Sequence, residues 1–383
     1  MRHNKSIRER TGAAIVFVGQ FPPPTDGLTL VTSRLASALI EAGHELTVAD
    51  IGGRGAVRSP LYHVSRLARI FRALGLIAAQ SRRRGPGHCY LAVDGGLGLV
   101  YSLVIAGFAR LCGFRLFLHH HSYGYVDAWR PLMSCLLALV GVGATHICLS
   151  ERMARDLGAR YRRDLRTFVL SYAAFVSAAA PIARRPARAE VTIGLLGNLT
   201  PDKGLHAFIE IMRLARERGL PIRGVLAGPI LLESDQRFLR SVVGELAGWL
   251  DYRGAVYGGD KARFYQDVDV FVFASAYRNE AQPVVVYEAL ANGVPVISVD
   301  RGCVRDQVAE AGFVFEPDAD FVGEALLALA WYLARPDALA AHRRAARSRH
   351  EEDRRIARTR IVALFAAPPV AVNEAPIRGA SLQ

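Results

Sequence analysis

Two glutamates with seven residues between them stand in the stretch NEAQPVVVYEALANGVPVIS (279–298). Pro283 suits the first turn of a helix, because its missing N–H would have no partner there, and Gly293 suits the helix end. Glu280 therefore falls in the loop before the helix and Glu288 within it. A carboxylate can accept hydrogen bonds from neighbouring ribose hydroxyls, and the free amides of a helix start can bind phosphate oxygens. The spacing predicts a nucleotide site with one acid for a sugar and one for the ribose.

Each glutamate also has a plain structural interpretation. Glu280 is compatible with a charged loop residue and Glu288 with an exposed helix residue. However, the neighbours of Glu288 are nearly all apolar: Val284, Val285, Tyr287, Ala289 and Leu290. A carboxylate in a largely buried helix needs a partner, so we expect one for Glu288.

A lysine lies in the segment GNLTPDKG (197–204), which follows an apolar run and opens a helix. Near the positive end of that helix, Lys203 is placed to bind a phosphate. Lys5, Lys203 and Lys261 are the only lysines among 48 basic residues. A compact charge where arginine otherwise prevails favours phosphate binding; a solvated lysine at a helix start is the alternative.

Three histidines follow one another in FLHHHSYGY (117–125), at the end of a predicted strand. Alternation along the strand puts His119 and His121 on one face and His120 on the other. We predict that His121 hydrogen-bonds a transferred sugar, whereas a satisfied structural histidine is the alternative. No carboxylate is spaced to complete a metal site with them.

No metal or other cofactor is predicted for this chain. Asp267 and Asp269 imitate a metal-binding DxD motif, but they open an apolar run that is typical of a buried strand. The five cysteines are scattered and form no CxxC pair, so neither a zinc site nor a disulfide framework is expected. A reducing cytoplasm fits this usage best.

The charge balance indicates anionic partners. The 383 residues carry a formal net charge of +13, which attracts sugar nucleotides, nucleic acids or anionic membranes. Nucleic acid is disfavoured, because no basic run is interleaved with stacking aromatics. No secretory signal is recognisable, and the most apolar stretch (95–109) is too short to cross a bilayer. We interpret that stretch as a buried helix.

The segment 58–84 contains seven arginines and no acid. At helical spacing, one stripe is polar and another is apolar. The polar stripe comprises His63, Arg66, Arg69 and Arg72, and the apolar stripe comprises Val64, Leu67, Phe71 and Leu74. A basic amphipathic helix on an anionic membrane and a surface helix packed on its own sheet are both compatible with this pattern.

Short apolar runs alternate with helical patterns along the chain, which is typical of parallel α/β domains. We expect a basic tail (1–12), a first Rossmann-like domain (13–176), an Ala/Pro/Arg-rich linker (177–190), a second Rossmann-like domain (191–366) and a loose tail (367–383). Ligands of such domains bind at the carboxyl ends of the strands. The fold class is therefore α/β, with two doubly wound domains facing each other across a cleft.

The glutamate pair, the following EALANGVPVIS and the upstream GNLTPDKG together resemble the family 4 glycosyltransferases, which have the GT-B fold. The N-terminal half resembles them more loosely through PPPTDGLTLVTSRLASALIEAGHELTV. The resemblance implies that Lys203 binds the donor diphosphate, Glu288 the ribose and Glu280 the transferred sugar. It also places Gly27 near the donor phosphates. The predicted donor-contacting set is completed by Asn198, Gln282 and Val284.

The chain departs from the family pattern at three places. Asn198 stands where the family often has arginine, and the first loop reads Asp26-Gly27 instead of paired glycines. Ser171-Tyr172 replaces the Asn-Gly commonly found at the end of the first domain.

The resemblance implies a retaining transferase that moves a sugar from a nucleotide-diphosphate donor to a glycan or lipid-linked hydroxyl. We expect it in the cytoplasm, either free or on the cytoplasmic membrane face. A sugar-nucleotide epimerase or a phosphorylase with the same fold is an alternative. A non-catalytic protein that binds membrane surfaces is another.

Overall fold

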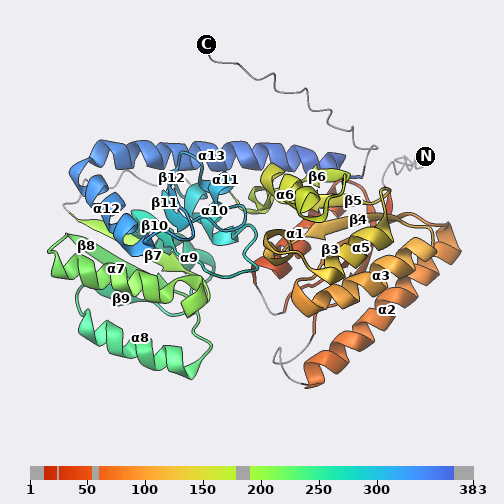
Figure 1. Cartoon of the computed structure of the whole chain (residues 1–383), viewed down its shortest axis with the longest axis horizontal. Coiled ribbons are helices and arrows are strands. Elements are labelled where there is room, and N and C mark those ends of the chain that lie inside the picture. The colour runs from red at the N-terminus through yellow and green to blue at the C-terminus, as the bar shows by residue number, and fades with distance from the viewer. Residues whose placement is uncertain (1–12, 24–25, 54–59, 178–189, 366–383) are drawn as a thin grey trace, which may run out of the picture.

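The computed structural model describes residues 13–23, 26–53, 60–177 and 190–365. The expected tails (1–12 and 367–383) and nearly all of the expected linker (177–190) lie outside these residues. The described chain forms two units, each built on a six-stranded parallel sheet with helices on both faces (Figure 1). A parallel strand that is covered on both faces is apolar at nearly every position. Such strands therefore stand out in the sequence as continuous apolar runs.

The first sheet has the strand order β2-β1-β3-β4-β5-β6. Each strand falls within one of the short apolar runs from which the sequence predicts strands (13–21, 44–50, 88–94, 114–121, 145–150 and 167–172), so these predictions are confirmed. The strands are β1 (Ala14–Gly19), β2 (Glu45–Asp50), β3 (His88–Val93), β4 (Arg115–His120), β5 (Thr145–Cys148) and β6 (Thr167–Val169).

Helices cover both faces of the first sheet. Right-handed crossovers place α1 on one face and the helices between β2 and β6 on the other. The helices are α1 (Gly27–Glu41), α2 (Pro60–Arg84), η1 (Gly96–Gly98), α3 (Leu99–Leu111), α4 (Gly124–Asp127), α5 (Pro131–Val140), α6 (Glu151–Tyr161) and η2 (Tyr172–Phe175).

The second sheet has the order β12-β11-β10-β7-β8-β9. Its strands are β7 (Val191–Leu196), β8 (Ile222–Ala227), β9 (Leu250–Tyr252), β10 (Val270–Phe273), β11 (Val296–Val299) and β12 (Gly312–Phe315). Its helices are η3 (Pro201–Lys203), α7 (Leu205–Glu217), α8 (Glu233–Glu245), α9 (Gly258–Asp267), α10 (Val284–Ala291), α11 (Val304–Val308) and α12 (Phe321–Ala334). A strand is also predicted at 251–258, but β9 ends at Tyr252, and Gly254 soon after it adopts a positive φ of 67° that a strand does not allow.

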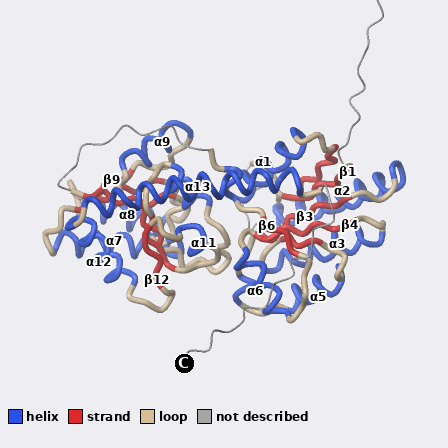
Figure 2. The backbone as a smooth tube through the Cα atoms, turned by 90° about the horizontal axis from the view of Figure 1, so that it is seen from above, coloured by secondary structure: helices blue, strands red, loops and turns tan. Residues whose placement is uncertain are grey.

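The last helix, α13 (Pro336–Ala363), passes from the second unit to the first (Figures 1 and 2). It packs on α10 and α12 of the second unit and on η2 and α1 of the first. Beyond its end, the Phe365 ring lies 4.5 Å from that of Phe117 and 5.5 Å from that of His88. The range predicted for the second domain (191–366) therefore ends in a segment that packs on the first sheet. The apolar contacts of Phe365, rather than its position in the sequence, assign this segment to the first unit.

The polar stripe of α2 does not face water along its whole length. Arg66 is buried and its guanidinium lies 2.6 Å from the Asp94 carboxylate, while Arg69 pairs with Asp50. Both aspartates lie at the carboxyl ends of strands, and these charges turn the arginines inward. In a surface helix packed on its own sheet the polar stripe would face water, but Arg66 and Arg69 point toward the sheet. Instead, part of the apolar stripe faces outward, and the Phe71 side chain is 71% exposed.

The stretch 95–109 forms η1 and most of α3, so the helix prediction is confirmed. It is not wholly buried, however, because Val100 and Val104 are 44% and 47% exposed. Within the part of the chain that the structure describes, no helix is both long and apolar enough to cross a bilayer.

Candidate active site between the two domains

Two helix starts face each other where the two sheets meet. A Cβ atom on Gly27, the first residue of α1, would lie 3.5 Å from a methyl group of Val284, the first residue of α10. Asp26 caps α1 by accepting a hydrogen bond from the Thr29 amide at 2.9 Å. No side chain caps α10, whose N-cap is Pro283. The Val286 amide donates to the Pro283 carbonyl at 3.2 Å, which leaves the amides of Val284 and Val285 for a phosphate, and the positive helix end also favours an anion there.

Lys203 lies beside this opening because of the tight turn that follows it. Gly204 has a φ of 94°, and a Cβ there would lie 2.8 Å from the carbonyl oxygen of Ala274. Only glycine allows the chain to pass so close to the end of β10. The turn holds the Lys203 ammonium 4.4 Å from the centre of the Tyr277 ring, in an ion pair with Glu280.

Glu280 is 9% exposed, and its side-chain contacts within the described chain are on one carboxylate oxygen. Oε2 accepts from both Lys203 and the Ser275 hydroxyl, the latter at 3.1 Å. Oε1 is left for a ligand. An ammonium has three N–H groups, so Lys203 also keeps donors for a ligand while it holds Glu280.

Glu288 has the partner that its apolar surroundings require. The Lys261 ammonium lies 2.6 Å from Oε1, and the Tyr265 hydroxyl donates to Oε2 at 3.2 Å. The two lysines in the described chain thus pair with the two glutamates. The sequence analysis did not place Lys261 in the site. The signal that could have found it is the rarity of lysine, since only three of the 48 basic residues are lysines.

The histidines take the alternating positions that the sequence predicts. His119 and His121 are neighbours, with ring centres 4.0 Å apart. His120 points the other way, to His146 at 3.0 Å and the Tyr125 hydroxyl at 3.1 Å. His120 therefore belongs to a buried polar cluster on the opposite face of β4 from His119 and His121.

His121 is held by a tyrosine that the sequence analysis did not include in the site. Its Nδ1 lies 2.6 Å from the Tyr172 hydroxyl. Burial lowers the pKa of His121 to about 3, and burial raises the pKa of Tyr172, so both groups are neutral at pH 7. When the phenol donates to Nδ1, the imidazole proton resides on Nε2. Nε2 is buried and has no hydrogen-bond partner within the described chain, so this N–H is an unpaired donor.

The loops that carry His121 and Glu280 touch. The Ser122 hydroxyl donates to the Asn279 side-chain oxygen at 3.2 Å. Tyr172 also interacts with Glu280. The pKa of its phenol is raised mainly by burial, then by Cys303, and next by the negative charge of Glu280. The structure thus brings together five of the predicted site residues, which are Gly27, His121, Lys203, Glu280 and Val284.

Two other residues of the predicted set are Gln282 and Asn198. The Gln282 side chain joins the two units, because its Oε1 accepts from the Tyr172 amide at 2.7 Å and its Nε2 donates to the Leu149 carbonyl at 3.0 Å. Its amide is thus already engaged in interdomain contacts. Asn198 is exposed just beyond β7.

Structural contacts occupy the two aspartates of the DxD sequence. Asp267 pairs with Arg253 at 2.8 Å, and Asp269 accepts from the Thr192 amide at 2.9 Å. Across the described ranges, no three His, Cys, Asp or Glu side chains converge as metal ligands would.

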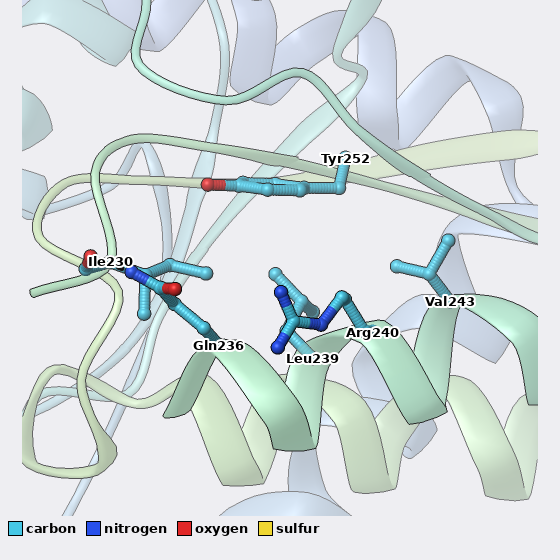
Figure 3. Close-up of a pocket in the computed structure, with 6 residues that line it drawn as sticks. All are labelled: Ile230, Gln236, Leu239, Arg240, Val243 and Tyr252. Atoms are coloured by element: carbon cyan, nitrogen blue, oxygen red, sulfur yellow. Dashed lines mark hydrogen bonds between the residues drawn. The ribbon is translucent and has the colours of Figure 1, made fainter. Parts of the chain in front are cut away.

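Two hollows lie outside this cluster. One, of about 380 Å³, lies between α8 and Tyr252 and is lined mainly by apolar groups with Arg240 (Figure 3). The other, of about 520 Å³, lies at the junction of α6, α10 and α13 and includes Gln282 and Tyr287. Neither contains Lys203, Glu280 or Glu288.

Part of the sequence matches a known family. Residues 190–330 match the family described as "Glycosyl transferases group 1". O-antigen chain mannosyltransferase B of Escherichia coli is 26% identical over 139 residues, which are 34% of this chain and 35% of that protein. GDP-mannose-dependent alpha-mannosyltransferase of Mycobacterium tuberculosis (strain CDC 1551 / Oshkosh) is 32% identical over 117 residues, 30% of this chain and 27% of that protein. The similarity thus spans about a third or less of each relative.

Solved structures are similar over nearly the whole chain. A glycosyltransferase from Rickettsia africae ESF-5 has a TM-score of 0.67 and 14% identity, covering 93% of this chain and 98% of that one. Anabaena Alr3699/HepE in complex with UDP-glucose has a TM-score of 0.64 and 16% identity, covering 92% and 98%. The chain has the GT-B fold. The predicted arrangement of two Rossmann-like domains is thereby confirmed.

Proposed function

We propose that this protein is a retaining glycosyltransferase that moves a sugar from a nucleotide-diphosphate donor to a hydroxyl of a glycan or lipid-linked acceptor. The observation that carries the proposal is the Lys203–Glu280 pair beside the uncapped start of α10. The match of residues 190–330 to a glycosyltransferase family supports it.

The diphosphate binds between the start of α10 and Lys203 in this proposal. When the bond from the anomeric carbon to the diphosphate oxygen breaks, its electron pair stays on that oxygen. The helix amides and the ammonium stabilise this developing charge, a kind of stabilisation that usually contributes most to the rate. Because these groups supply the positive charge, we propose that transfer proceeds without a divalent ion.

The transferred sugar lies between Glu280 and His121. Oε1 of Glu280 accepts from a sugar hydroxyl, and Nε2 of His121 donates to a sugar oxygen. A neutral imidazole suits this task, because a charged one would oppose positive charge at the anomeric centre. Burial keeps His121 neutral.

Glu288 binds the ribose, and Lys261 with Tyr265 fixes the direction of its carboxylate. Each carboxylate oxygen has a lone pair beyond the one already engaged. Two neighbouring ribose hydroxyls can therefore donate to Glu288 without breaking its contacts.

Retention is proposed from the sequence resemblance. The acceptor oxygen attacks from the face that the diphosphate leaves, and its proton passes to a donor phosphate oxygen. The products are a nucleoside diphosphate and a glycoside with the donor's anomeric configuration.

A donor screen tests this function. GDP-mannose comes first, because two similar proteins are named as mannosyltransferases, and UDP-glucose follows. We expect thermal stabilisation by one donor and slow hydrolysis of it in EDTA, both weakened by Glu280→Gln. Activity that strictly requires Mg²⁺ or Mn²⁺ would overturn the metal-free mechanism. Donor isomerisation without an acceptor would indicate an epimerase, dependence on inorganic phosphate a phosphorylase, and absence of any turnover a binding protein.

A further inference from the structure

Tyr172, the first residue of η2, connects the second unit of the protein to the histidine that contacts the sugar in the proposed function. We propose that Tyr172 is a positioning residue for sugar transfer, which fixes the imidazole proton of His121 on Nε2 and is itself held in place by Gln282 of the second unit. This role rests on the proposed function, in which Nε2 of His121 donates a hydrogen bond to a sugar oxygen. Ser171-Tyr172 replaces the Asn-Gly of the family pattern, so the contact belongs to this chain in particular.

The direction of the hydrogen bond between Tyr172 and His121 follows from the buried polar groups on both sides. The phenol oxygen lies 2.6 Å from Nδ1 of the imidazole, and Tyr172 is 5% exposed. If the phenol donates, only the N–H at Nε2 lacks a partner within the described chain. If Nδ1 donates instead, both the phenol hydrogen and the lone pair of Nε2 lack one. An unpaired buried polar group costs free energy, so donation by the phenol is favoured.

A second tyrosine makes the same kind of contact with the neighbouring histidine. The Tyr90 hydroxyl lies 2.7 Å from Nδ1 of His119. Tyr90 lies on β3 in the core of the first unit, and its ring stacks on that of Phe17 at 4.1 Å. This pair lies wholly within the first unit, and it is therefore a matched control for a pair that the second unit supports.

The backbone of Tyr172 is held by the second unit. Its amide donates to Oε1 of Gln282 at 2.7 Å, while Nε2 of Gln282 donates to the Leu149 carbonyl of the first unit at 3.0 Å. Gln282 is 4% exposed and stands between Glu280 and the start of α10. The segment that carries the proposed sugar-binding carboxylate therefore also holds the tyrosine behind the histidine.

A further chain of hydrogen bonds reaches η2 from the last helix. Ser171, the N-cap residue of η2, donates from its hydroxyl to that of Tyr287 on α10 at 2.8 Å. Tyr287 in turn donates to the Asp353 carboxylate of α13 at 3.0 Å. As a result, η2 packs on α10 and α13 as well as on α1 of the first unit.

These contacts couple the hydrogen-bond donor on His121 to the contact between the units. If η2 lost Gln282, the phenol of Tyr172 would no longer be directed at Nδ1. The imidazole could then turn or carry its proton on Nδ1. A lone pair on Nε2 would repel a sugar oxygen instead of binding it, so transfer would slow while the nucleotide site stayed intact.

Tyr172→Phe tests the positioning role, because it removes the phenol oxygen and keeps the ring. We expect kcat for sugar transfer to fall roughly ten-fold, which corresponds to one hydrogen bond used in the transition state. The affinity for nucleoside diphosphate should stay unchanged. Nitrogen-15 NMR of labelled histidine should show His121 protonated on Nε2 in the parent and on both nitrogens in the variant. Tyr90→Phe should leave the His121 signal and kcat close to those of the parent.

Two further variants separate positioning from packing. Glutamine in His121→Gln presents an N–H donor and has no tautomers. In that background Tyr172→Phe should change kcat less than about two-fold, whereas a purely structural role would cost the same factor in both backgrounds. Gln282→Leu tests the part of the second unit and should give the same mixture of His121 tautomers as Tyr172→Phe.

Three outcomes would overturn the positioning role. His121 carries its proton on Nδ1 in the parent, or Tyr172→Phe changes neither the tautomer nor kcat, or its cost is the same in the His121→Gln background. Turnover by the parent distinguishes this failure from that of the proposed function. If the parent transfers sugar and the His121 proton does not depend on Tyr172, the positioning role alone fails. If the proton depends on Tyr172 but no sugar nucleotide is turned over, the proposed function fails.

Discussion

Replacing Lys203 with methionine should weaken the binding of nucleoside diphosphate about 100-fold. Methionine keeps most of the length and apolar volume of lysine but removes the charge. Losing a hydrogen bond to a charged group costs about 1.5–3 kcal/mol. We expect a loss of binding free energy at the upper end of this range. Glu280 is only 9% exposed, and without Lys203 its negative charge would remain unpaired near the diphosphate. About 3 kcal/mol corresponds to roughly 100-fold in affinity.

Lys261→Met is the matched control, since it also removes a lysine that pairs with a glutamate. Calorimetry with a nucleoside monophosphate and the corresponding diphosphate separates the two sites. Lys203→Met should weaken the binding of the diphosphate much more than the binding of the monophosphate. Lys261→Met should weaken both alike, because it misorients Glu288, which contacts the common ribose.

A double variant sharpens this test. Lys203→Met/Glu280→Gln removes the stranded charge as well and should recover part of the lost diphosphate affinity, an interaction that a mutant cycle measures. The reasoning is refuted if Lys203→Met binds diphosphate like the parent, or if both lysine variants show the same ratio of monophosphate to diphosphate affinity.

Three further predictions concern other parts of the site and the core. Glu288→Gln should weaken nucleoside monophosphate and the full donor by similar factors in titration calorimetry; a loss confined to the full donor would contradict the ribose assignment. Gly27→Val should lower donor affinity without lowering the thermal midpoint, because its branched side chain narrows the gap to α10; Gly75→Val, with no atom within 4 Å of a new Cβ, should leave affinity unchanged. Burial lowers the pKa values of His121 and His146 to about 3 and about 4. As the pH drops below about 6.5, these histidines therefore take up protons in the unfolded chain but not in the folded one. By pH 5.5 each of them lowers the free energy of unfolding by about 1.4 kcal/mol. Urea unfolding at pH 7.5 and 5.5 measures this loss, and equal midpoints would contradict it.

The parts of the site that could be predicted are those encoded within short segments. Glu280, the start of α10 and Glu288 lie within nine consecutive positions, so local spacing determines their relative places. The strands of the first sheet were equally readable, because burial on both faces leaves an apolar run with sharp ends.

Contacts between distant segments could not be predicted in this way. Lys261 reaches Glu288 from a helix that the sequence analysis did not identify, and Tyr172 reaches His121 across 51 positions of the chain. In α2, helical periodicity alone predicts that the arginine side chains face water. Only the positions of Asp50 and Asp94 at the ends of β2 and β3, the strands on either side of β1, reveal that Arg66 and Arg69 point inward.

The chain joins its two sheets at two places, once between β6 and β7 and again along α13. Because α13 packs on helices of both units, a movement of one sheet relative to the other has to bend this helix or pull Phe365 away from His88 and Phe117. The buried ring of Phe365 therefore opposes the separation of Lys203 and His121, which lie on different units.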